Sequence, residues 1–299
     1  MQVVILYAAV VLIWGSTWAA IPYQLGVVAD EVSVAYRFAI GAVVLFSYAA
    51  LSGRKIVVPL RCYPMVIVQG LLLFSINYFF AYYGTAHITS GLVAVIFSSI
   101  VICNAFFERV FFHTPLEGRL LIASFFGMLG IALIFWPEIS ALNLRDRTVF
   151  GLVMVIVGTV TASLGNMAAV VNTGRNLPVV AVNAHGMLWG ALLSVLSAVL
   201  LGREFNFSFE AGYVWSLLFL AIFGSAIAFG CYLALIRTIG AARAAYSSVL
   251  FPVVALVIST IAENYRWSVP AVLGVSLTLA GNWLVLARTR QSLKPVKPE

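Results

Sequence analysis

The stretch from Phe74 to Val110, FSINYFFAYYGTAHITSGLVAVIFSSIVICNAFFERV, sets the pattern of the whole chain. It contains an aromatic-rich apolar segment, a short link and a second apolar segment that carries the hydroxyl pair Ser98-Ser99. The stretch from Leu218 to Thr260 repeats this plan, with the pair Ser247-Ser248 in the corresponding place. The sequence therefore indicates one helical unit that is written twice.

The composition is that of a membrane protein. Of 299 residues, 63% are hydrophobic and only 9% are charged, which is too few charges to cover the surface of a soluble domain. The net charge of +7 comes from basic residues scattered through short loops and a tail, a pattern that sets membrane orientation and does not indicate nucleic-acid binding. The three cysteines lie far apart, so we expect neither a disulfide framework nor a metal site.

Ten apolar runs are long enough to cross a bilayer, which takes about 20 helical residues. The sequence therefore predicts an all-α integral membrane protein with ten transmembrane helices. We expect residues 1–137 and 149–288 to form two five-helix units, with a linker at 138–148 and a basic tail at 289–299. The predicted spans are Val3–Pro22, Val32–Leu51, Tyr63–Tyr83, Ile88–Phe107, Gly118–Trp136, Val149–Val171, Val179–Leu201, Gly212–Ile236, Ala241–Ala262 and Val269–Ala287.

The charges of the loops predict the orientation of these spans. With ten spans both termini lie on one side of the membrane, and that side has most of the Lys and Arg residues, among them Arg54, Lys55 and Arg237. The loops on the opposite side have most of the acids, including Asp30 and Glu31. Because cytoplasmic loops carry the excess of Lys and Arg, both termini and the basic tail are predicted to be cytoplasmic.

The two units are related by a constant shift along the sequence. This shift sets Pro252 over Val101, and Gly274 and Gly281 over Ala123 and Gly130. Each unit then has five helices, and because five is odd, the second unit must have the opposite orientation in the membrane. Inverted repeats are common in secondary transporters, where the substrate site lies near the midplane between the repeats. The repeat therefore predicts a central cavity and alternating access.

Short motifs along almost the whole chain resemble a known family. They are Trp14-Gly15-Ser16, Arg37, Tyr82-Tyr83-Gly84, Gly127-x-x-Gly130, Tyr232-x-x-Leu235, Pro252, and Gly274 with Gly281. In these motifs the chain resembles EamA-type members of the drug/metabolite transporter superfamily, and among them the bacterial YddG-type aromatic amino-acid exporters. The resemblance implies a ten-helix basket in the bacterial inner membrane that exports amino acids or other amphipathic metabolites from the cytoplasm. Val101 stands where family members often carry a proline, which argues against equal bending of the two halves.

Arg37 is a charged residue inside a predicted span. It lies only about 7 Å into that helix, at roughly 1.5 Å per residue. Its side chain can extend to the outer interface beside Asp30 and Glu31, which is the more ordinary outcome for such a position. Alternatively, it anchors a substrate carboxylate.

An aromatic face on the third span is a candidate substrate surface. Phe74, Tyr78 and Tyr82 follow i, i+4, i+8 spacing, with Asn77 beside them. Aromatic rings with polar tips can stack on a flat substrate and also donate a hydrogen bond. The family resemblance implies that this helix faces the cavity, whereas interfacial packing is the alternative. The approximate partners in the second half are Tyr232 and Tyr246.

Hydroxyl, amide and indole groups add further candidates. Such groups more often bond to their own or a neighbouring helix. Ser99, Asn166 and Ser248 are the ones that we expect to bind substrate. Trp14 and Trp18 lie on one face of the first span and are also candidates, although helix packing explains them as readily.

Pro252 is predicted to be a hinge or gate. A proline inside a helix removes one backbone hydrogen bond and kinks the helix. Pairs of small residues four positions apart, such as Gly186 and Gly190, indicate close helix contacts. These contacts can form within one chain or between two copies in a homodimer.

Other functional classes leave signatures that this sequence lacks. A membrane enzyme needs clustered catalytic groups, and an ATP-driven pump needs a GxxxxGK[ST] loop. Glu108 and Glu263 lie near helix ends and only His185 lies deeper, so we expect little obligatory ion coupling. We therefore predict a transporter of a small molecule, without enzymatic activity or a cofactor. The alternatives to an amino-acid substrate are an organic phosphate or nucleotide sugar, and an organic cation exported by a multidrug carrier.

Overall fold

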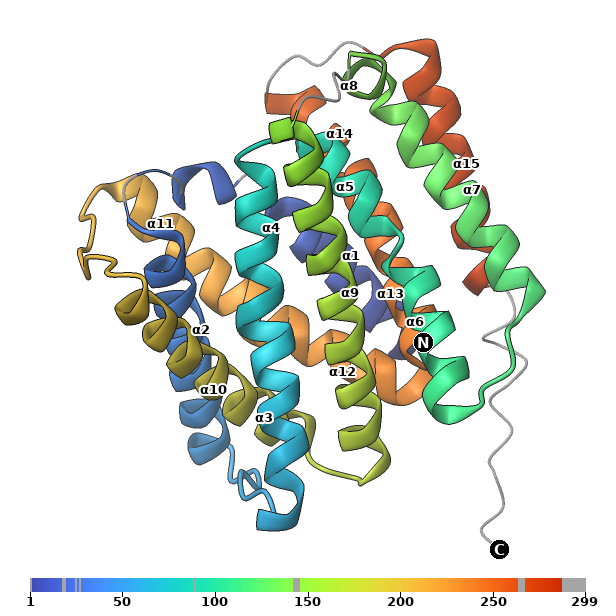
Figure 1. Ribbon diagram of the computed structural model, residues 1–299. Helices are drawn as coiled ribbons and strands as arrows, with labels where there is room; N and C mark the ends of the chain where they lie inside the picture. The colour runs from blue at the N-terminus through green and yellow to red at the C-terminus, as the bar shows by residue number, and fades with distance from the viewer. Residues whose placement is uncertain are drawn as a thin grey trace, which may run out of the picture.

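A computed structural model describes residues 2–286 of the chain, except 18, 19, 25, 27, 89, 142–145 and 263–266. Helices and short connections make up this part of the chain, and it contains no strand (Figure 1). The predicted all-α class is thereby confirmed for the described residues.

The helices follow one another with short links. In the first half they are α1 (Gln2–Thr17), η1 (Ile21–Gln24), α2 (Asp30–Leu51), η2 (Leu60–Cys62), α3 (Tyr63–Leu71), η3 (Leu72–Ile76), α4 (Asn77–Thr85), α5 (Ser90–Ser98), α6 (Ile100–Phe112), α7 (Gly118–Ile134) and α8 (Trp136–Ser140). In the second half they are α9 (Asp146–Gly174), α10 (Val179–Leu200), α11 (Ala211–Phe219), η4 (Leu220–Ile227), α12 (Ala228–Ile239), α13 (Ala241–Ala245), η5 (Tyr246–Leu250), α14 (Phe251–Ala262) and α15 (Val269–Leu286).

Seven of the helical segments are long and apolar enough to cross a membrane. They are Asp30–Leu51, Leu60–Thr85, Val95–Phe112, Arg147–Gly174, Val179–Leu200, Ala211–Ile239 and Ala241–Ile258. Three shorter apolar helices accompany them, at Gln2–Thr17, Gly118–Ile134 and Val269–Val285. Each of the ten predicted spans overlaps one of these segments. The count of ten membrane crossings stays a prediction, because these three shorter helices fall short of a full span within the described residues.

Two long helices contain a π-helical section near their middle. One is η3, between α3 and α4, and the other is η4, between α11 and α12. A π-helical turn is wider than an α-helical turn, so it displaces carbonyl groups from the regular hydrogen-bond pattern, and such turns are frequent at functional sites. In η4 the Ser225 hydroxyl donates to the Leu220 carbonyl five residues earlier, at 3.0 Å. Hydropathy periodicity did not predict these sections.

A second change of geometry occurs at the level of the two hydroxyl pairs. In the second half, η5 is a 3₁₀ turn and Pro252 follows as the second residue of α14. The missing N–H of the proline therefore falls at a junction, not in the middle of a regular α-helix as the sequence had suggested. In the first half, α5 and α6 are separated at Ser99, whose N–H donates to the Ile96 carbonyl at 3.0 Å. Both halves thus change helical geometry here, although only one has the proline.

The helices pack in pairs that combine the two halves. Figure 1 shows α7 beside α15 at one side of the bundle and α2 beside α10 at the other. Between them α4 and α6 pack on α9, while α12 and α14 pack on α1. The α7–α15 contact is so close that a Cβ on Gly130 would lie 2.5 Å from the Gly274 carbonyl oxygen. Phe38, Phe74 and Met187 are fully buried in the largest apolar core, to which helices of both halves contribute.

Candidate functional site

A cavity of about 210 Å³ lies between the two halves of the chain. Its wall combines α1, α2, α4 and α5 with α9, α12 and the η5 turn. The residues that line it are Trp14, Thr17, Ile21, Arg37, Leu73, Asn77, Tyr78, Ala81, Tyr82, Thr85, Val93, Phe97, Ile100, Ala162, Asn166, Phe229, Tyr232, Ala245, Ser247, Ser248 and Phe251. Most of these side chains are apolar or aromatic, as is usual for a small-molecule site.

Trp14 is the centre of an aromatic cluster in this wall. Its ring centroid lies 4.8 Å from that of Phe229, 5.1 Å from that of Tyr232 and 5.7 Å from that of Phe251. The indole N–H donates to the Gly224 carbonyl at 2.8 Å, so the π-helical section η4 supplies the acceptor. The indole is thereby fixed in orientation, and a rigid aromatic surface can stack on an apolar ligand at little entropic cost.

Arg37 is the charged residue of the cavity wall. Its side chain is 5% exposed, and its Nε donates to the Ser225 hydroxyl at 2.8 Å. The guanidinium carbon lies 5.0 Å from the ring centroid of Tyr78, a cation–π distance. Arg37 therefore points into the bundle, and the expected extension to the outer interface is wrong. The reason is tertiary: η4 provides a hydrogen-bond acceptor and Tyr78 an aromatic face.

The surroundings of Arg37 leave its guanidinium free to bind an anion. Gly224 has no side chain there, and a Cβ on it would lie 3.4 Å from Nη2 of Arg37. The hydroxyl of Tyr82 also interacts with the guanidinium. In the described part of the chain, the ion pairs join Arg203 to Glu31 and Arg243 to Glu117, and neither includes Arg37. A buried guanidinium without a counter-ion is costly, so the site favours a carboxylate ligand.

Three polar atoms of the wall have no hydrogen-bond partner among the described residues. They are Oδ1 of Asn77, Oδ1 of Asn166 and Oγ of Ser248. All three residues line the cavity. Buried polar groups are nearly always satisfied, so unpartnered acceptors in a cavity wall point to water or to a ligand that donates hydrogen bonds. An ammonium group is such a donor.

A polar network supports the cavity wall at Asn166. Asn104 Oδ1 accepts hydrogen bonds from the Ser163 hydroxyl at 2.6 Å and from Nδ2 of Asn166 at 3.3 Å. The Nδ2 of Asn104 donates to the Ala241 carbonyl at 3.1 Å. The hydroxyl of Tyr232 interacts with both amide side chains. The network holds the amide of Asn166 through its nitrogen, while its Oδ1 has no partner among the described residues.

The structure brings most of the predicted substrate-binding residues together. Those that line the cavity are Trp14, Arg37, Asn77, Tyr78, Tyr82, Asn166, Tyr232 and Ser248. These residues come from both halves of the chain. They share one cavity because α1 and α4 pack on helices of the second half. Trp18 lies outside the described residues.

Three predicted site residues lie outside the cavity wall. The Ser99 hydroxyl donates to the Ile96 carbonyl of its own helix at 2.6 Å, as such hydroxyls commonly do. Tyr246 is buried between α7 and α15, where its hydroxyl donates to the Ala123 carbonyl and contacts Gly281. Pro252 is buried directly after the lining residue Phe251, so any effect on the cavity is exerted through the backbone.

Sequence reasoning missed several residues of the site. Phe229 lies three positions before Tyr232 and therefore on the same helical face, a spacing that would have indicated it. Asn104 is fully buried, and an amide at membrane depth is costly enough to signal a function. Thr17 and Phe97 also line the cavity, but nothing in the sequence distinguishes them from packing residues.

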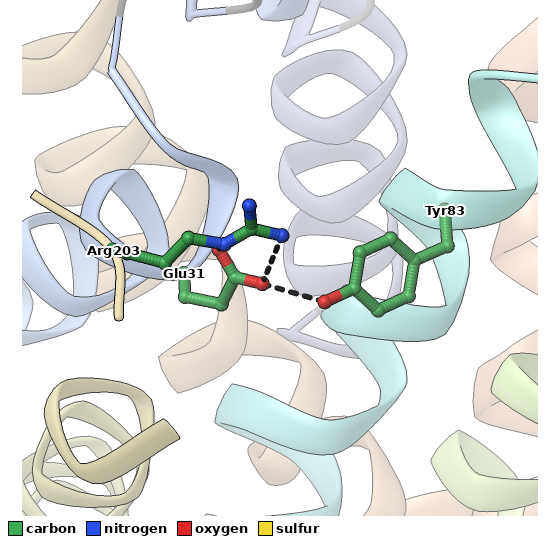
Figure 2. A network of polar contacts seen from close by, with 3 residues as sticks. All are labelled: Glu31, Tyr83 and Arg203. Atoms are coloured by element: carbon green, nitrogen blue, oxygen red, sulfur yellow. Dashed lines mark hydrogen bonds and ion pairs between the residues drawn. The ribbon is translucent and has the colours of Figure 1, made fainter. Parts of the chain in front are cut away.

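A second polar network lies where α2 begins and α4 ends. Glu31 is only 1% exposed, accepts a hydrogen bond from the Tyr83 hydroxyl at 2.5 Å, and pairs with Arg203 at 3.3 Å (Figure 2). Arg203 belongs to the link between α10 and α11 and is partly exposed. The carboxylate of Glu31 raises the pKa of Arg203 above its ordinary value. Three segments are thus joined by one polar network.

His185 is a packing residue in this structure. Its ring nitrogens lie 3.2 Å from the Tyr63 hydroxyl and 3.0 Å from the Ile56 carbonyl oxygen. Its ring also packs edge-on against Phe46 at 5.1 Å. His185 does not line the cavity. In the described residues, the His, Cys, Asp and Glu side chains form no group of three that could hold a metal ion.

Comparison with known proteins identifies the family. A family model described as the EamA-like transporter family matches residues 1–136 and again 149–287, which together make up most of the chain. The chain belongs to the EamA-like transporter family. It is a multi-pass membrane protein and a transporter, not an enzyme.

Curated relatives are similar over nearly the full length. The chain is 24% identical over 286 residues to the uncharacterized transporter YoaV of Bacillus subtilis, with 91% of this chain and 92% of that protein covered. It is 25% identical over 256 residues to the uncharacterized inner membrane transporter YedA of Escherichia coli, with 84% and 80% covered. A crystal structure superposes with a TM-score of 0.79 at 17% identity, over 98% of this chain and 99% of the other, which shows a shared fold.

Proposed function

We propose that this EamA-like transporter exports amino acids with large apolar or aromatic side chains from the cytoplasm. The observation that carries the proposal is an unpaired guanidinium, that of Arg37, in a cavity whose other lining is mostly aromatic and apolar. The resemblance to aromatic amino-acid exporters agrees with this chemistry.

The cavity matches the three parts of such a substrate. The carboxylate would bind to the planar guanidinium of Arg37, which can donate two parallel hydrogen bonds. The ammonium group would donate to the unpartnered oxygens of Asn77, Asn166 and Ser248. The apolar side chain would lie against the Trp14 cluster. One cation, a few acceptors and an aromatic surface are the complement of an apolar zwitterion.

The same features disfavour the alternative substrates. A nucleotide sugar or organic phosphate carries two or more negative charges, and Arg37 is the one Lys or Arg among the lining residues described. An organic cation would be repelled by a guanidinium that lacks a counter-ion. The volume of about 210 Å³ is also below the roughly 300–1,000 Å³ typical of sites for drug-sized ligands. A compact amino acid fits these limits best.

Alternating access between two inverted repeats is part of the proposal. Contacts that such a symmetry would require occur in pairs: α4 packs on α9 as α12 packs on α1, and α6 packs on α9 as α14 packs on α1. The two π-helical sections, η3 and η4, also lie at corresponding places in the two halves. The hinge assigned to Pro252 would act at the junction of η5 with α14, directly beside the cavity wall.

We infer that the described conformation is the outward-facing state of this cycle. The lining extends to Thr17 and Thr85, at the helix ends that loop charge assigns to the outside. At the opposite end α6 is joined to α13, because Asn104 donates to the Ala241 carbonyl and Glu108 accepts from the Ala241 N–H at 2.6 Å. The described lining contains no Asp, Glu or His, which supports transport without obligatory proton coupling.

Counterflow in proteoliposomes tests the function. Vesicles loaded with unlabelled phenylalanine or tryptophan should accumulate the labelled compound faster than empty vesicles or vesicles loaded with a nucleotide sugar. The rate should be the same with and without an imposed proton gradient. Acceleration by the nucleotide sugar, or by an organic cation alone, would contradict the amino-acid assignment.

A further inference from the structure

A second cleft, separate from the central cavity, lies at the end of the bundle where α1 begins and α12 ends. Its volume is about 590 Å³. It is lined by Gln2, Leu6, Arg54, Lys55, Pro178, Val179, Val180, Ala234, Arg237 and Thr238. None of these residues lines the central cavity. The proposed transport mechanism does not use this cleft.

The cleft concentrates positive charge without a counter-ion. Arg54 and Lys55 come from the link between α2 and η2, and Arg237 comes from the last turn of α12, yet the three bases line one hollow. The lining contains no Asp or Glu, and the ion pairs of the described residues include none of the three bases. Arg54 lies over the ring of Tyr48 at 5.3 Å, and Arg237 donates to Oδ1 of Asn176 at 3.3 Å, so both guanidinium groups have neutral partners.

A helix end adds to this positive field. The 22-residue helix α10 begins at Val179, within the cleft. The first N–H groups of a helix have no partner in the helix and carry partial positive charge, which favours an anion. Basic side chains and a helix N-terminus together provide the donors that a phosphate group prefers.

Most of the remaining wall is apolar, with Gln2 and Thr238 as its polar members. Leu6, Pro178, Val180 and Ala234 lie beside the three bases. A free inorganic anion gains nothing from such a surface, whereas an acyl chain does. The loop-charge prediction places this end of the bundle at the cytoplasmic leaflet, where anionic lipids are concentrated and where basic pockets between helices bind their head groups.

We infer that this cleft binds the phosphate group of an anionic phospholipid, with the acyl chain against the apolar wall. The phosphate lies between Arg54, Lys55 and Arg237, and the lipid bridges the first turn of α1 and the last turn of α12. These segments belong to different halves of the chain. The bound lipid therefore links the halves at the end opposite to Glu31.

Lipid binding measured by native mass spectrometry tests the assignment. The full-length protein is mixed with phosphatidylglycerol, with zwitterionic phosphatidylcholine, or with inorganic phosphate. The cleft variant carries Arg54→Gln, Lys55→Gln and Arg237→Gln. Its control carries Arg61→Gln, Arg109→Gln and Arg175→Gln, which remove the same charge from exposed positions outside the cleft wall.

The expected result is tight phosphatidylglycerol binding that the cleft variant weakens at least tenfold and the control variant leaves within about twofold. Phosphatidylcholine should bind weakly to all three proteins, and inorganic phosphate should not displace the lipid. Equal lipid binding by the cleft variant and the control would overturn the inference. Binding of phosphate alone, with the same dependence on the three bases, would reassign the cleft to a soluble anion and overturn the lipid assignment. Single substitutions, compared by thermal unfolding, separate lost binding from lost folding.

Discussion

Replacement of Arg37 by Gln should weaken the binding of phenylalanine far more than it weakens the protein fold. Gln is neutral and too short to reach both Ser225 and a ligand. The wild-type guanidinium uses its Nε–H on Ser225 and also interacts with the Tyr82 hydroxyl, so its remaining N–H groups are left for a carboxylate. The substitution therefore removes the proposed carboxylate anchor and leaves the aromatic wall unchanged.

The size of the effect follows from the burial of this group. Truncation of one partner of a buried, hydrogen-bonded charge pair costs about 2–5 kcal/mol of binding free energy. At about 1.4 kcal/mol per tenfold, the dissociation constant should rise from roughly 30-fold to several thousand-fold. The free energy of unfolding should change by only about 1–2 kcal/mol. The change in stability stays small because two effects of the substitution oppose each other. The hydrogen bond to Ser225 is lost, but the fold no longer has to bury the charge of Arg37 without a counter-ion.

A substrate analogue makes the measurement specific. Phenylethylamine has the ring and ammonium group of phenylalanine but no carboxylate. Equilibrium binding of both compounds to the wild type and to Arg37→Gln separates loss of the anchor from general damage to the cavity. We expect phenylalanine to lose affinity by the factor above, and phenylethylamine to bind equally well or better.

Equal losses for phenylalanine and phenylethylamine would refute the reasoning, since Arg37 would then only shape the cavity. Two variants serve as controls. Arg37→Lys keeps the charge but loses the planar pair of donors, so its affinity should be intermediate. Ser225→Ala removes the acceptor at Nε and the hydroxyl that donates to the Leu220 carbonyl, and it should shift phenylalanine affinity by no more than about tenfold.

Three further outcomes concern stability, measured by thermal unfolding in detergent. Gly130→Ala should lower the free energy of unfolding by about 1–3 kcal/mol, because the new Cβ would be forced against α15; Gly118→Ala, which has open space around it, should have no such effect. Asn104→Leu should cost about 1–3 kcal/mol, because it leaves the Ser163 hydroxyl and the Ala241 carbonyl without their buried partner, and a midpoint equal to that of the wild type would contradict the network. Arg203→Ala should destabilise more than Glu31→Gln, because the first change leaves a buried carboxylate unpaired and the second leaves only a partly exposed guanidinium; the reverse order would show that Glu31 is hydrated.

Features that depend on local sequence were predicted well. The low charge and long apolar runs gave the membrane class, since every backbone group in a bilayer must be satisfied within a helix. The helical segments overlap the predicted ranges because chain length and hydropathy are local properties. The spacing of Tyr78 and Tyr82 also placed both on one face of a helix, and that face lines the cavity.

Features that depend on distant partners were missed or misread. The sequence favoured an Arg37 that reaches the outer interface beside Glu31, yet Arg37 meets Ser225, 188 positions away. Glu31 itself is buried and bonds to Arg203, 172 positions away. Tyr246 was assigned to the cavity by analogy between the halves, but the close approach of α7 and α15 encloses it elsewhere.

The sequence by itself thus determined a helical membrane transporter and the helix faces that carry aromatic and polar groups. Only the tertiary structure decided which of these groups share a cavity, because that depends on which helices of the two halves come into contact. The wider turn at η4 is the clearest case. It presents Gly224 and Ser225 to Trp14 and Arg37, which lie 210 and 188 positions away. No local pattern encodes that meeting, since it is fixed by the packing of α1 and α2 on η4.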